Sequence, residues 1–360
     1  MRALRSRNTP TLSPASAGAL TLGTLADVVS HADVEEERQP APAATGPEER
    51  PLVPTWLWLG AILIVALFVR VWGLNRVGFN SDETVYAGQA ASIAGNVTLQ
   101  KFFPIYRAHP LLFQTVLSVL YKFTTSDFAA RLLSVFFGVG TVALTYLTGR
   151  LLYGRRAGLI AAAVLAVMPY HVVVTRQVLL DGPLVFFSTL TLYLAARYAV
   201  TQRPMWLYAT GAGMGLTFLA KETGIVLVAA VYAFLALAPR VKVRIRDLIV
   251  SGAVMGCIML PYPLSIAFGN SSKTGKSFFA WQLLRRPNHG ALFYFTNVPA
   301  ALGYIVFAAA LAGLWVLRKE RSWREVLLLS WILVPVGFFQ LWPVKGFQYL
   351  LPIATPFAIL

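Results

Sequence analysis

The chain has few charged residues and a single cysteine. Asp, Glu, Lys and Arg make up 13% of its 360 residues, whereas about a quarter is typical of a soluble domain. The lone Cys257 excludes a disulfide within the chain and any metal site built from several cysteines. The sequence also contains no Walker phosphate-binding loop, no HExxH zinc motif and no CxxC pair. None of these common signatures of nucleotide, zinc or thiol chemistry is therefore present to suggest a function.

Long hydrophobic runs dominate the sequence instead. Hydrophobic residues make up 57% of the chain, and an apolar run of about 18 residues or more can cross a bilayer as a helix. We therefore expect an all-α polytopic membrane protein with a bundle of about ten transmembrane helices. The predicted spans are Trp56–Leu74, Ala129–Tyr153, Ala157–Thr175, Val178–Tyr198, Met205–Ala220, Thr223–Ala238, Leu248–Phe268, Ala291–Leu317, Val326–Trp342 and a last run from Phe347 to Leu360. Within one of them, the small residues of Gly211–Gly215 predict close helix packing.

The net charge of +16 comes mostly from basic residues in the short loops between these runs. Cytoplasmic loops of membrane proteins are enriched in Lys and Arg, so the charge does not indicate a nucleic-acid partner. The densest clusters are Arg155-Arg156, Arg240–Arg246 and Arg318–Arg324. Because even numbers of predicted spans separate these clusters, all three are predicted to lie on the cytoplasmic side.

The first 50 residues differ from the rest of the chain. They are rich in Ala, Pro, Thr, Ser and Glu and have no apolar stretch long enough for a signal peptide. We expect residues 1–50 to be a disordered cytoplasmic tail and residues 51–360 to form the membrane domain. The apolar segment His109–Phe123 has only fifteen residues, which is short for a span. We expect it to lie along the membrane surface, so that residues 75–128 form one large external loop.

Acidic residues are scarce in the membrane domain, which has eight of them. Asp247, Glu320 and Glu325 fall among the cytoplasmic basic clusters. The other five fall on the predicted external face: Asp82, Glu83, Asp127, Asp181 and Glu222. Several basic residues fall on the same face: Arg107, His109, Arg176, Lys221, Lys345 and those of the loop Lys273–His289. Charged groups at the mouths of apolar helices are costly and tend to be paired or functional, so this mixed set is a candidate site.

Asp82 and Glu83 are the only adjacent acids on that face, and two interpretations of them stay open. They could belong to the first turn of a helix capped by Ser81, where the helix dipole favours carboxylates. Alternatively, one of them is a general base, which must lie close to an acceptor hydroxyl and be partly desolvated.

The other external residues also allow structural interpretations. Asp181 could pair with Arg176 or cap the helix that follows it. Lys221 and Glu222 could be ordinary charges of an exposed turn, although a lysine there could also bind an anionic lipid headgroup. Tyr349 could be an interfacial anchor, as Tyr and Trp near span ends usually are.

Taken in order, four segments resemble a known family. They are SDETVYAGQAASIAG, RAHPLLFQTVLSVLY, the long stretch ARLLSVFFGVGTVALTYLTGRLLYGRRAGLIAAAVLAVMPYHVVVTRQVLLDGPL, and GLTFLAKETGIVL. Together they resemble glycosyltransferase family 39, which includes the protein O-mannosyltransferases and the lipid A aminoarabinose transferases. The resemblance covers residues 56–360. It implies the GT-C membrane fold and a sugar donor carried on a polyprenyl phosphate, used on the external face of the bacterial cytoplasmic membrane.

The family motifs carry over residue by residue. The catalytic Asp of the first external loop and the Glu after it fall on Asp82 and Glu83, and a following Tyr falls on Tyr86. The family's His/Lys-Pro-Pro-Leu motif is matched by His109-Pro110-Leu111, without the second Pro. The acid of the second external loop falls on Asp181. The late basic residue and Tyr-Leu-Leu-Pro are approximated by Lys345 and Tyr349–Pro352.

Some positions depart from this pattern. The aminoarabinose transferases have Arg where this chain has Val85, and Glu-Lys-Pro where it has Ala108-His109-Pro110. These differences argue against an aminoarabinose donor. The sequence also stops at Leu360 within an apolar run, which predicts a C-terminally truncated member of the family.

The resulting hypothesis is an inverting glycosyltransferase that acts on an acceptor hydroxyl of a protein, lipid or glycan. Asp82 is the predicted base, positioned by Glu83. The predicted donor and substrate residues are Tyr86, Arg107, His109, Arg176, Asp181, Lys221, Glu222, Lys345 and Tyr349. Basic groups can stabilise a leaving phosphate without a metal, although a divalent ion between Asp82 and Asp181 is an alternative. The competing functions are a transporter or lipid-carrier flippase and a non-catalytic membrane subunit.

Overall fold

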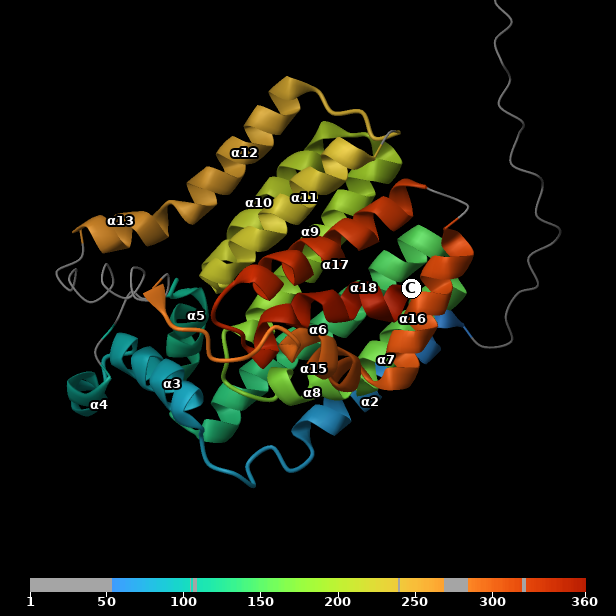
Figure 1. The fold of residues 1–360 in the computed structure, drawn as a ribbon. Coiled ribbons are helices and arrows are strands. Elements are labelled where there is room, and N and C mark those ends of the chain that lie inside the picture. The colour runs from blue at the N-terminus through green and yellow to red at the C-terminus, as the bar shows by residue number, and fades with distance from the viewer. Residues whose placement is uncertain (1–53, 104, 106–108, 239, 269–283, 319–321) are drawn as a thin grey trace, which may run out of the picture. The chain divides into compact units, whose positions relative to one another are not determined.

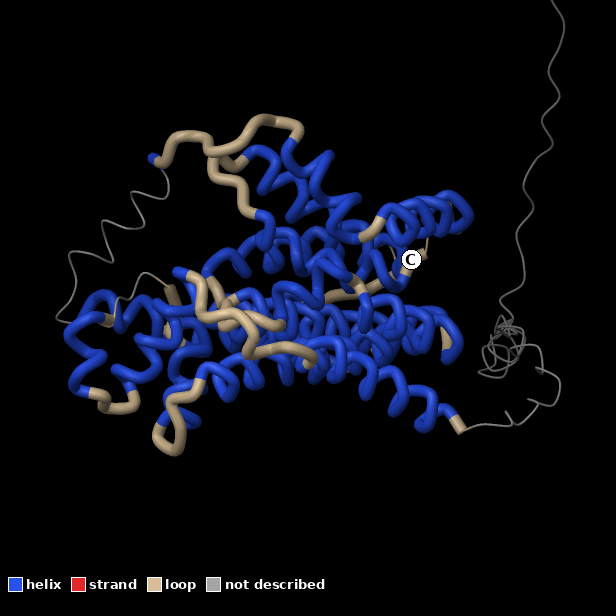
Figure 2. Tube along the Cα trace, turned by 90° about the horizontal axis from the view of Figure 1, so that it is seen from below, coloured by secondary structure: helices blue, strands red, loops and turns tan. Residues whose placement is uncertain are grey.

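The computed structural model describes residues 54–360 except 104, 106–108, 239, 269–283 and 319–321. The predicted tail over residues 1–50 and the candidate Arg107 lie outside the described residues. The described part of the chain contains helices and no β-strand, which confirms the all-α prediction (Figures 1 and 2).

The helices, in chain order, have the following bounds (Figure 1). They are α2 Thr55–Val71, α3 Ser81–Ile93, α4 Val97–Phe102, α5 Leu112–Tyr121, α6 Asp127–Tyr153, α7 Arg155–Val167, α8 Pro169–Thr175, α9 Asp181–Thr201, α10 Pro204–Ala220, η1 Glu222–Gly224, α11 Ile225–Leu237, α12 Ile245–Met259, α13 Pro261–Phe268, α15 Phe293–Leu302, α16 Tyr304–Leu317, α17 Trp323–Leu341, η2 Phe347–Ile353 and α18 Ala354–Ile359.

Among the described residues, α6, α9 and α17 are each long and apolar enough to cross a membrane. Three bent pairs could each form a broken span: α7 with α8, α12 with α13, and α15 with α16, bent by 60°, 41° and 99°. The spans predicted at Ala157–Thr175, Leu248–Phe268 and Ala291–Leu317 thus coincide with bent helix pairs, and the count of about ten spans stays a prediction. Pro169 and Pro261 each begin the second helix of a pair, since proline lacks the amide hydrogen that would continue the first. At the third break, Gly303 adopts φ +90°, which a residue with a side chain rarely does.

A buried arginine fastens the broken span α7–α8 to α2. Arg70 has no exposed surface. Its Nη1 donates to the carbonyl of Ala166 at 2.8 Å, its Nε to Thr175 Oγ1 at 3.0 Å, and its Nη2 to His171 Nδ1 at 2.7 Å. A carbonyl group in the last turn of α7, which has no partner within the helix, thus accepts a hydrogen bond from Arg70. The position of α8 is thereby set, and α8 leads directly into the start of α9.

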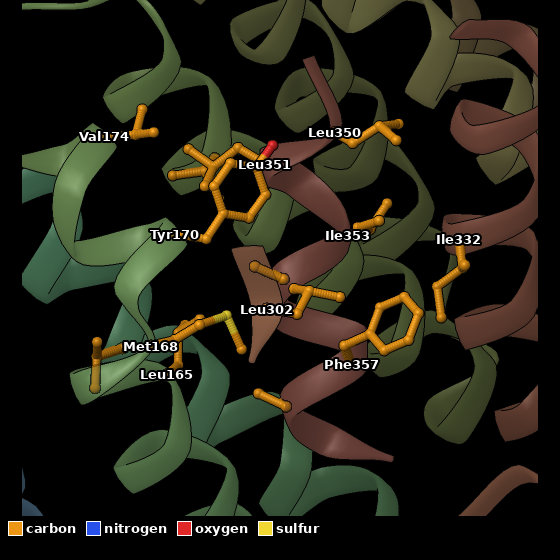
Figure 3. Packing of buried hydrophobic residues seen from close by; sticks show 14 of the residues in the cluster. Leu165, Met168, Tyr170, Val174, Leu302, Ile332, Leu350, Leu351, Ile353 and Phe357 are labelled. Atoms are coloured by element: carbon orange, nitrogen blue, oxygen red, sulfur yellow. The ribbon is translucent and has the colours of Figure 1, made fainter. Parts of the chain in front are cut away.

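The largest hydrophobic core joins α7 and α8 to η2 and α18 (Figure 3). Tyr170 of α8 lies against η2, with its hydroxyl donating to the carbonyl of Phe347 at 2.5 Å. The labelled side chains of this core are Leu165, Met168, Tyr170, Val174, Leu302, Ile332, Leu350, Leu351, Ile353 and Phe357. These contacts bring the late segment Phe347–Ile353 beside the ends of α8 and α9.

Glycines allow α10 to pack closely on its neighbours, as the small-residue segment predicts. A Cβ at Gly213 would lie 2.6 Å from Thr191 Oγ1 of α9, and one at Gly215 would lie 2.8 Å from the Cβ of Ile258 in α12. Neither position has room for a methyl group. Close packing here keeps the end of α10 next to the start of α9.

Helices α3, α4 and α5 gather at one end of the bundle (Figure 1). A third apolar cluster joins α3 and α5 to the first turn of α6 and to the link between α8 and α9, through residues such as Ala90, Phe113, Ala130 and Val178. With ten residues, α5 is too short to cross a bilayer alone. The segment between α2 and α6 therefore covers the same end of the bundle at which α9 begins and α10 ends.

Candidate active site

The first turn of α3 points its two acids in different directions. Asn80 is the N-cap, and its Oδ1 accepts hydrogen bonds from the backbone N–H groups of Asp82 and Glu83, both at 3.0 Å. Glu83 Oε2 accepts in return from the N–H of Asn80, which completes a capping box. The prediction that Ser81 is the cap is wrong, because Ser81 is already helical. Asp82 is exposed, whereas Glu83 is buried.

Glu83 is held by a buried ion pair with Arg131 of α6. Arg131 donates to both carboxylate oxygens, from Nε at 2.8 Å and from Nη2 at 2.9 Å, and the N–H of Val178 donates to Oε1 at 3.0 Å. Burial alone would raise the pKa of Glu83, but the hydrogen bonds from Arg131, Asn80 and Val178 outweigh it and lower the pKa. Glu83 is therefore an anchor between α3, α6 and the α8–α9 link.

Arg131 also fixes the segment that leads into α3. Its Nη1 donates to the carbonyls of Leu74 and Val77, at 2.9 and 2.6 Å, and its Nη2 to that of Gly78 at 2.9 Å. Sequence reasoning missed Arg131. The available signal was an arginine just inside a predicted span, a place where charge is rarely tolerated without a partner.

Lys221 and Asp181 form a second buried pair, between the end of α10 and the start of α9. Lys221 Nζ donates to both Asp181 oxygens, at 2.8 and 2.9 Å, and lies 5.2 Å from the centre of the Tyr349 ring. The alternative pairing of Asp181 with Arg176 is wrong, because Arg176 donates to the carbonyl of Trp72 at 2.6 Å. The pair thus joins α9, α10 and η2 at one point.

His109 and Glu222 form a third pair, which connects the segment between α2 and α6 to the turn after α10. His109 Nδ1 lies 2.8 Å from Glu222 Oε2, and its ring meets the Tyr86 ring edge-on with centroids 6.2 Å apart. Lys221 and Glu222 are adjacent in sequence but pair with different parts of the chain. This turn is therefore built into the site, unlike an ordinary exposed turn.

Tyr86 of α3 lies where these groups meet. The pKa of its hydroxyl is raised well above the ordinary value, first by burial and then by the negative charges of Asp181, Asp82 and Glu222. The two carboxylates singled out in the sequence, Asp82 and Asp181, thus both act on one phenol. We call the following set the acid–base cluster: Asp82, Tyr86, His109, Asp181, Lys221, Glu222 and Tyr349.

Two predicted site residues have their described contacts elsewhere. Lys345 Nζ donates to the carbonyls of Gln340 and Trp342, at 2.9 and 3.1 Å, and so satisfies the end of α17. Arg176 contacts the end of α2, as above. In contrast, Arg285, which sequence reasoning did not single out, acts electrostatically on Tyr349. The only signal for it was its position in the predicted external loop before α15.

Comparison with known proteins finds similar chains and similar structures. The family model of the dolichyl-phosphate-mannose-protein mannosyltransferases matches residues 108–266. The undecaprenyl phosphate-alpha-4-amino-4-deoxy-L-arabinose arabinosyl transferase of Yersinia pestis is 26% identical over an alignment of 331 positions, which covers 84% of this chain and 58% of the relative. Dolichyl-phosphate-mannose–protein mannosyltransferase 1 of Candida albicans is 28% identical over an alignment of 279 positions, which covers 69% of this chain and 30% of the relative.

The crystal structure of ArnT from Cupriavidus metallidurans bound to undecaprenyl phosphate superposes with a TM-score of 0.71, at 19% identity over 84% of this chain and 59% of that one. The chain is similar to the glycosyltransferases of family 39 and has the fold of the ArnT structure. It is an integral membrane protein, as its apolar helices predict. It spans 58% of the length of the arabinosyl transferase that it matches.

Among the three carboxylates of the acid–base cluster, that of Asp82 is the exposed one. Among the described residues, no donor forms a hydrogen bond with the Asp82 side chain, whereas Asp181 and Glu222 accept from Lys221 and His109. Both Asp181 oxygens are engaged, and the described residues hold no group of three or more His, Cys, Asp or Glu that could bind a metal. The donor set therefore does not fit the alternative of a divalent ion between Asp82 and Asp181.

Proposed function

We propose that this chain belongs to an inverting glycosyltransferase that moves a sugar from a polyprenyl-phosphate donor to an acceptor hydroxyl. The observation that supports this most is that the Lys221–Asp181 and His109–Glu222 pairs lie at the end of the bundle where α3 carries Tyr86, against His109, and the exposed Asp82. Similarity to known proteins supports the donor class, since the Yersinia relative is named for an undecaprenyl phosphate donor.

In this proposal Asp82 is the general base. It accepts the proton of the acceptor hydroxyl while the hydroxyl oxygen attacks the anomeric carbon from the side opposite the phosphate. The bond from the anomeric carbon to the phosphate oxygen breaks, and the polyprenyl phosphate leaves with the electron pair. Glu83 is a positioning residue, because its carboxylate is fully engaged by Arg131 and backbone N–H groups.

The leaving phosphate gains negative charge in the transition state, so basic groups near it lower the barrier. Lys221 and His109 are proposed to supply that stabilisation, with Arg285 acting from the loop before α15. Lys221 and His109 now face Asp181 and Glu222. Donor binding would therefore exchange a carboxylate for a phosphate oxygen at these groups.

We place the acid–base cluster on the external face of a bacterial cytoplasmic membrane, with residues 1–50 as a cytoplasmic tail and residues 75–128 as the first external loop. Counting α2, α10, α11 and the segment Phe347–Ile359 as spans beside the six candidates gives the proposed bundle of about ten. The acceptor is proposed to be a protein, lipid or glycan hydroxyl.

Transfer from lipid-linked sugars tests the proposal. Purified protein in proteoliposomes receives a panel of radiolabelled polyprenyl-phosphate sugars, and labelled product is measured. We expect Asp82→Asn to slow transfer about 10²- to 10⁴-fold, the range of general acid–base catalysis. Asp127→Asn is the control, because Asp127 is also an exposed acid in the first turn of a helix. Full activity of Asp82→Asn would remove the base assignment.

The competing functions give different results in the same preparation. Movement of lipid-linked sugar across the bilayer without product, unchanged by Asp82→Asn, would favour a flippase. Absence of both transfer and movement, with a partner protein retained on purification, would favour a non-catalytic subunit.

A further inference from the structure

The end of the bundle opposite the acid–base cluster carries basic side chains that form no ion pair with a described acid. We define the basic face by six residues in or beside the turns between α9 and α10, α11 and α12, and α16 and α17: Arg197, Arg203, Lys242, Arg244, Arg318 and Arg324. Hydrogen bonds join these turns to one another and to the end of α6. Tyr198 donates to the carbonyl of Lys242 at 2.8 Å, and Tyr153 donates to Glu325 at 2.9 Å.

The described acids on this face are turned inward. Asp247 is buried and accepts a hydrogen bond from Tyr208 at 2.7 Å. Glu325 is buried and accepts from Tyr153 and Ser322. Every ion pair in the described part of the chain lies elsewhere, at Glu83, Asp181 or Glu222. The positive charges of the basic face are therefore not neutralised by described carboxylates.

Three of these arginines lie over tryptophan rings. The guanidinium carbon of Arg197 is 4.6 Å from the centre of the Trp206 ring, that of Arg318 is 3.4 Å from Trp315, and that of Arg324 is 5.8 Å from Trp323. Tryptophan near the end of a span sits at the level of lipid headgroups. Stacking on these rings thus holds the guanidinium groups at headgroup depth instead of letting them extend into water.

Arg197 has in addition a buried donor with no acceptor. Its Nε is buried and forms no hydrogen bond within the described part of the chain. Because this Nε is itself buried, a phosphate oxygen can contact Arg197 only through the exposed part of its side chain. Membrane insertion explains why basic residues favour one side, but it does not explain the stacking.

We propose that the basic face binds the phosphate groups of anionic phospholipids in the adjacent leaflet. The three stacked arginines contact lipid phosphates directly, and the neighbouring exposed basic residues add a field that attracts anionic headgroups. This interaction is independent of the acid–base cluster and of the proposed glycosyl transfer.

Thermal unfolding in nanodiscs tests this proposal on the purified full chain. The nanodiscs contain phosphatidylcholine alone or phosphatidylcholine mixed with phosphatidylglycerol. We expect the anionic lipid to raise Tm, because a ligand of the folded state stabilises it, and we expect high salt to shrink the rise. The triple variant R197Q/R318Q/R324Q should lose more than half of the rise while keeping the unmodified protein's Tm in phosphatidylcholine.

The matched control removes the same charge from the other end of the bundle. It is K101Q/K122Q/R286Q, three exposed basic residues outside the acid–base cluster. This variant should keep the full rise in Tm. If both triple variants lost the same part of the rise in Tm, net charge alone would explain the effect of anionic lipid, and the proposal would be overturned.

Inorganic phosphate added to phosphatidylcholine nanodiscs separates a lipid site from a free-anion site. We expect it to leave Tm unchanged, and a rise equal to that caused by phosphatidylglycerol would overturn the assignment to lipid. Native mass spectrometry gives a second measurement, in which the R197Q/R318Q/R324Q variant should retain fewer phosphatidylglycerol molecules than the control. Equal retention would also contradict the proposal.

Discussion

At the scale of single residues, the site depends on neighbours in sequence that perform different tasks. Asp82 is exposed and its carboxylate accepts no hydrogen bond from a described residue, while Glu83, the next residue, is buried against Arg131. Lys221 and Glu222 likewise have different partners: Lys221 pairs with Asp181 of α9, and Glu222 pairs with His109. Successive residues of a helix or tight turn point in different directions, so adjacency in sequence does not imply a shared function.

The stability of the protein should depend on pH through Glu83. Because its pKa is lowered from the ordinary value of 4.5 on folding, the folded state binds fewer protons than the unfolded state. Its contribution to stability is thus present above pH 4.5 and lost as pH falls through the lowered pKa. We expect Tm, followed in detergent by intrinsic fluorescence, to fall with acid in this range. The Glu83→Gln variant should be less stable at neutral pH but should show a smaller acid-dependent fall.

Breaking the Lys221–Asp181 pair from one side should cost more than removing it from both. A single substitution such as Lys221→Met leaves Asp181 buried without its partner, and the loss is typically about 3–5 kcal/mol. The double variant Lys221→Met with Asp181→Asn leaves no buried charge. Chemical denaturation of both single variants and the double variant gives the coupling free energy. Additive losses would show that the two groups do not stabilise each other.

At the scale of elements, helix packing decides how closely the ends of α9 and α10 approach. Gly213 faces Thr191 with no space for a methyl group, whereas Gly256 in α12 has nothing near its missing Cβ. The bends in the broken spans also determine where helix ends lie. The bend before Pro169 allows α8 to lead into the start of α9, and Arg70 holds that bend. A straight helix would carry Val178 away from Glu83.

Substitution of the two glycines should therefore have different effects. Gly213→Ala forces overpacking between α9 and α10 and should destabilise the protein by about 1–3 kcal/mol. Gly256→Ala should be neutral or stabilising by up to about 1 kcal/mol, because alanine favours a helix more than glycine does. Tm of the two variants in the same detergent makes the comparison. A smaller loss for Gly213→Ala than for Gly256→Ala would contradict the packing described here.

At the scale of the whole molecule, the distribution of basic residues predicts how the chain is oriented in the membrane, and this orientation can be tested. Cys257 is the only cysteine and is exposed, so a Cys257→Ala background allows single cysteines to be introduced. We expect Lys101→Cys to react with a membrane-impermeant maleimide in intact cells, and Lys242→Cys to react only after the cells are opened. The reverse pattern would invert the proposed topology and place the acid–base cluster in the cytoplasm.

The sequence by itself determined the class of protein and singled out most residues of the acid–base cluster. Apolar runs are a local property, and a helix that spans a bilayer satisfies its own backbone groups, so hydropathy alone predicts the all-helical membrane fold. Acids are rare in the membrane domain, and this rarity singled out Asp82, Asp181 and Glu222. Charged groups near hydrocarbon are costly, so those that occur tend to be paired or functional.

Only the tertiary structure decided which of those residues meet. Lys221 reaches Asp181 across 40 positions, and Arg131 reaches Glu83 across 48. Such partners depend on how helices pack and where they bend, and neither Gly213 nor the break at Pro169 reveals its neighbour locally. The structure likewise separated Lys345 and Arg176 from the cluster, because each satisfies the carbonyls of a helix end instead. Charge and hydropathy thus select the candidates, while packing assigns them to the site.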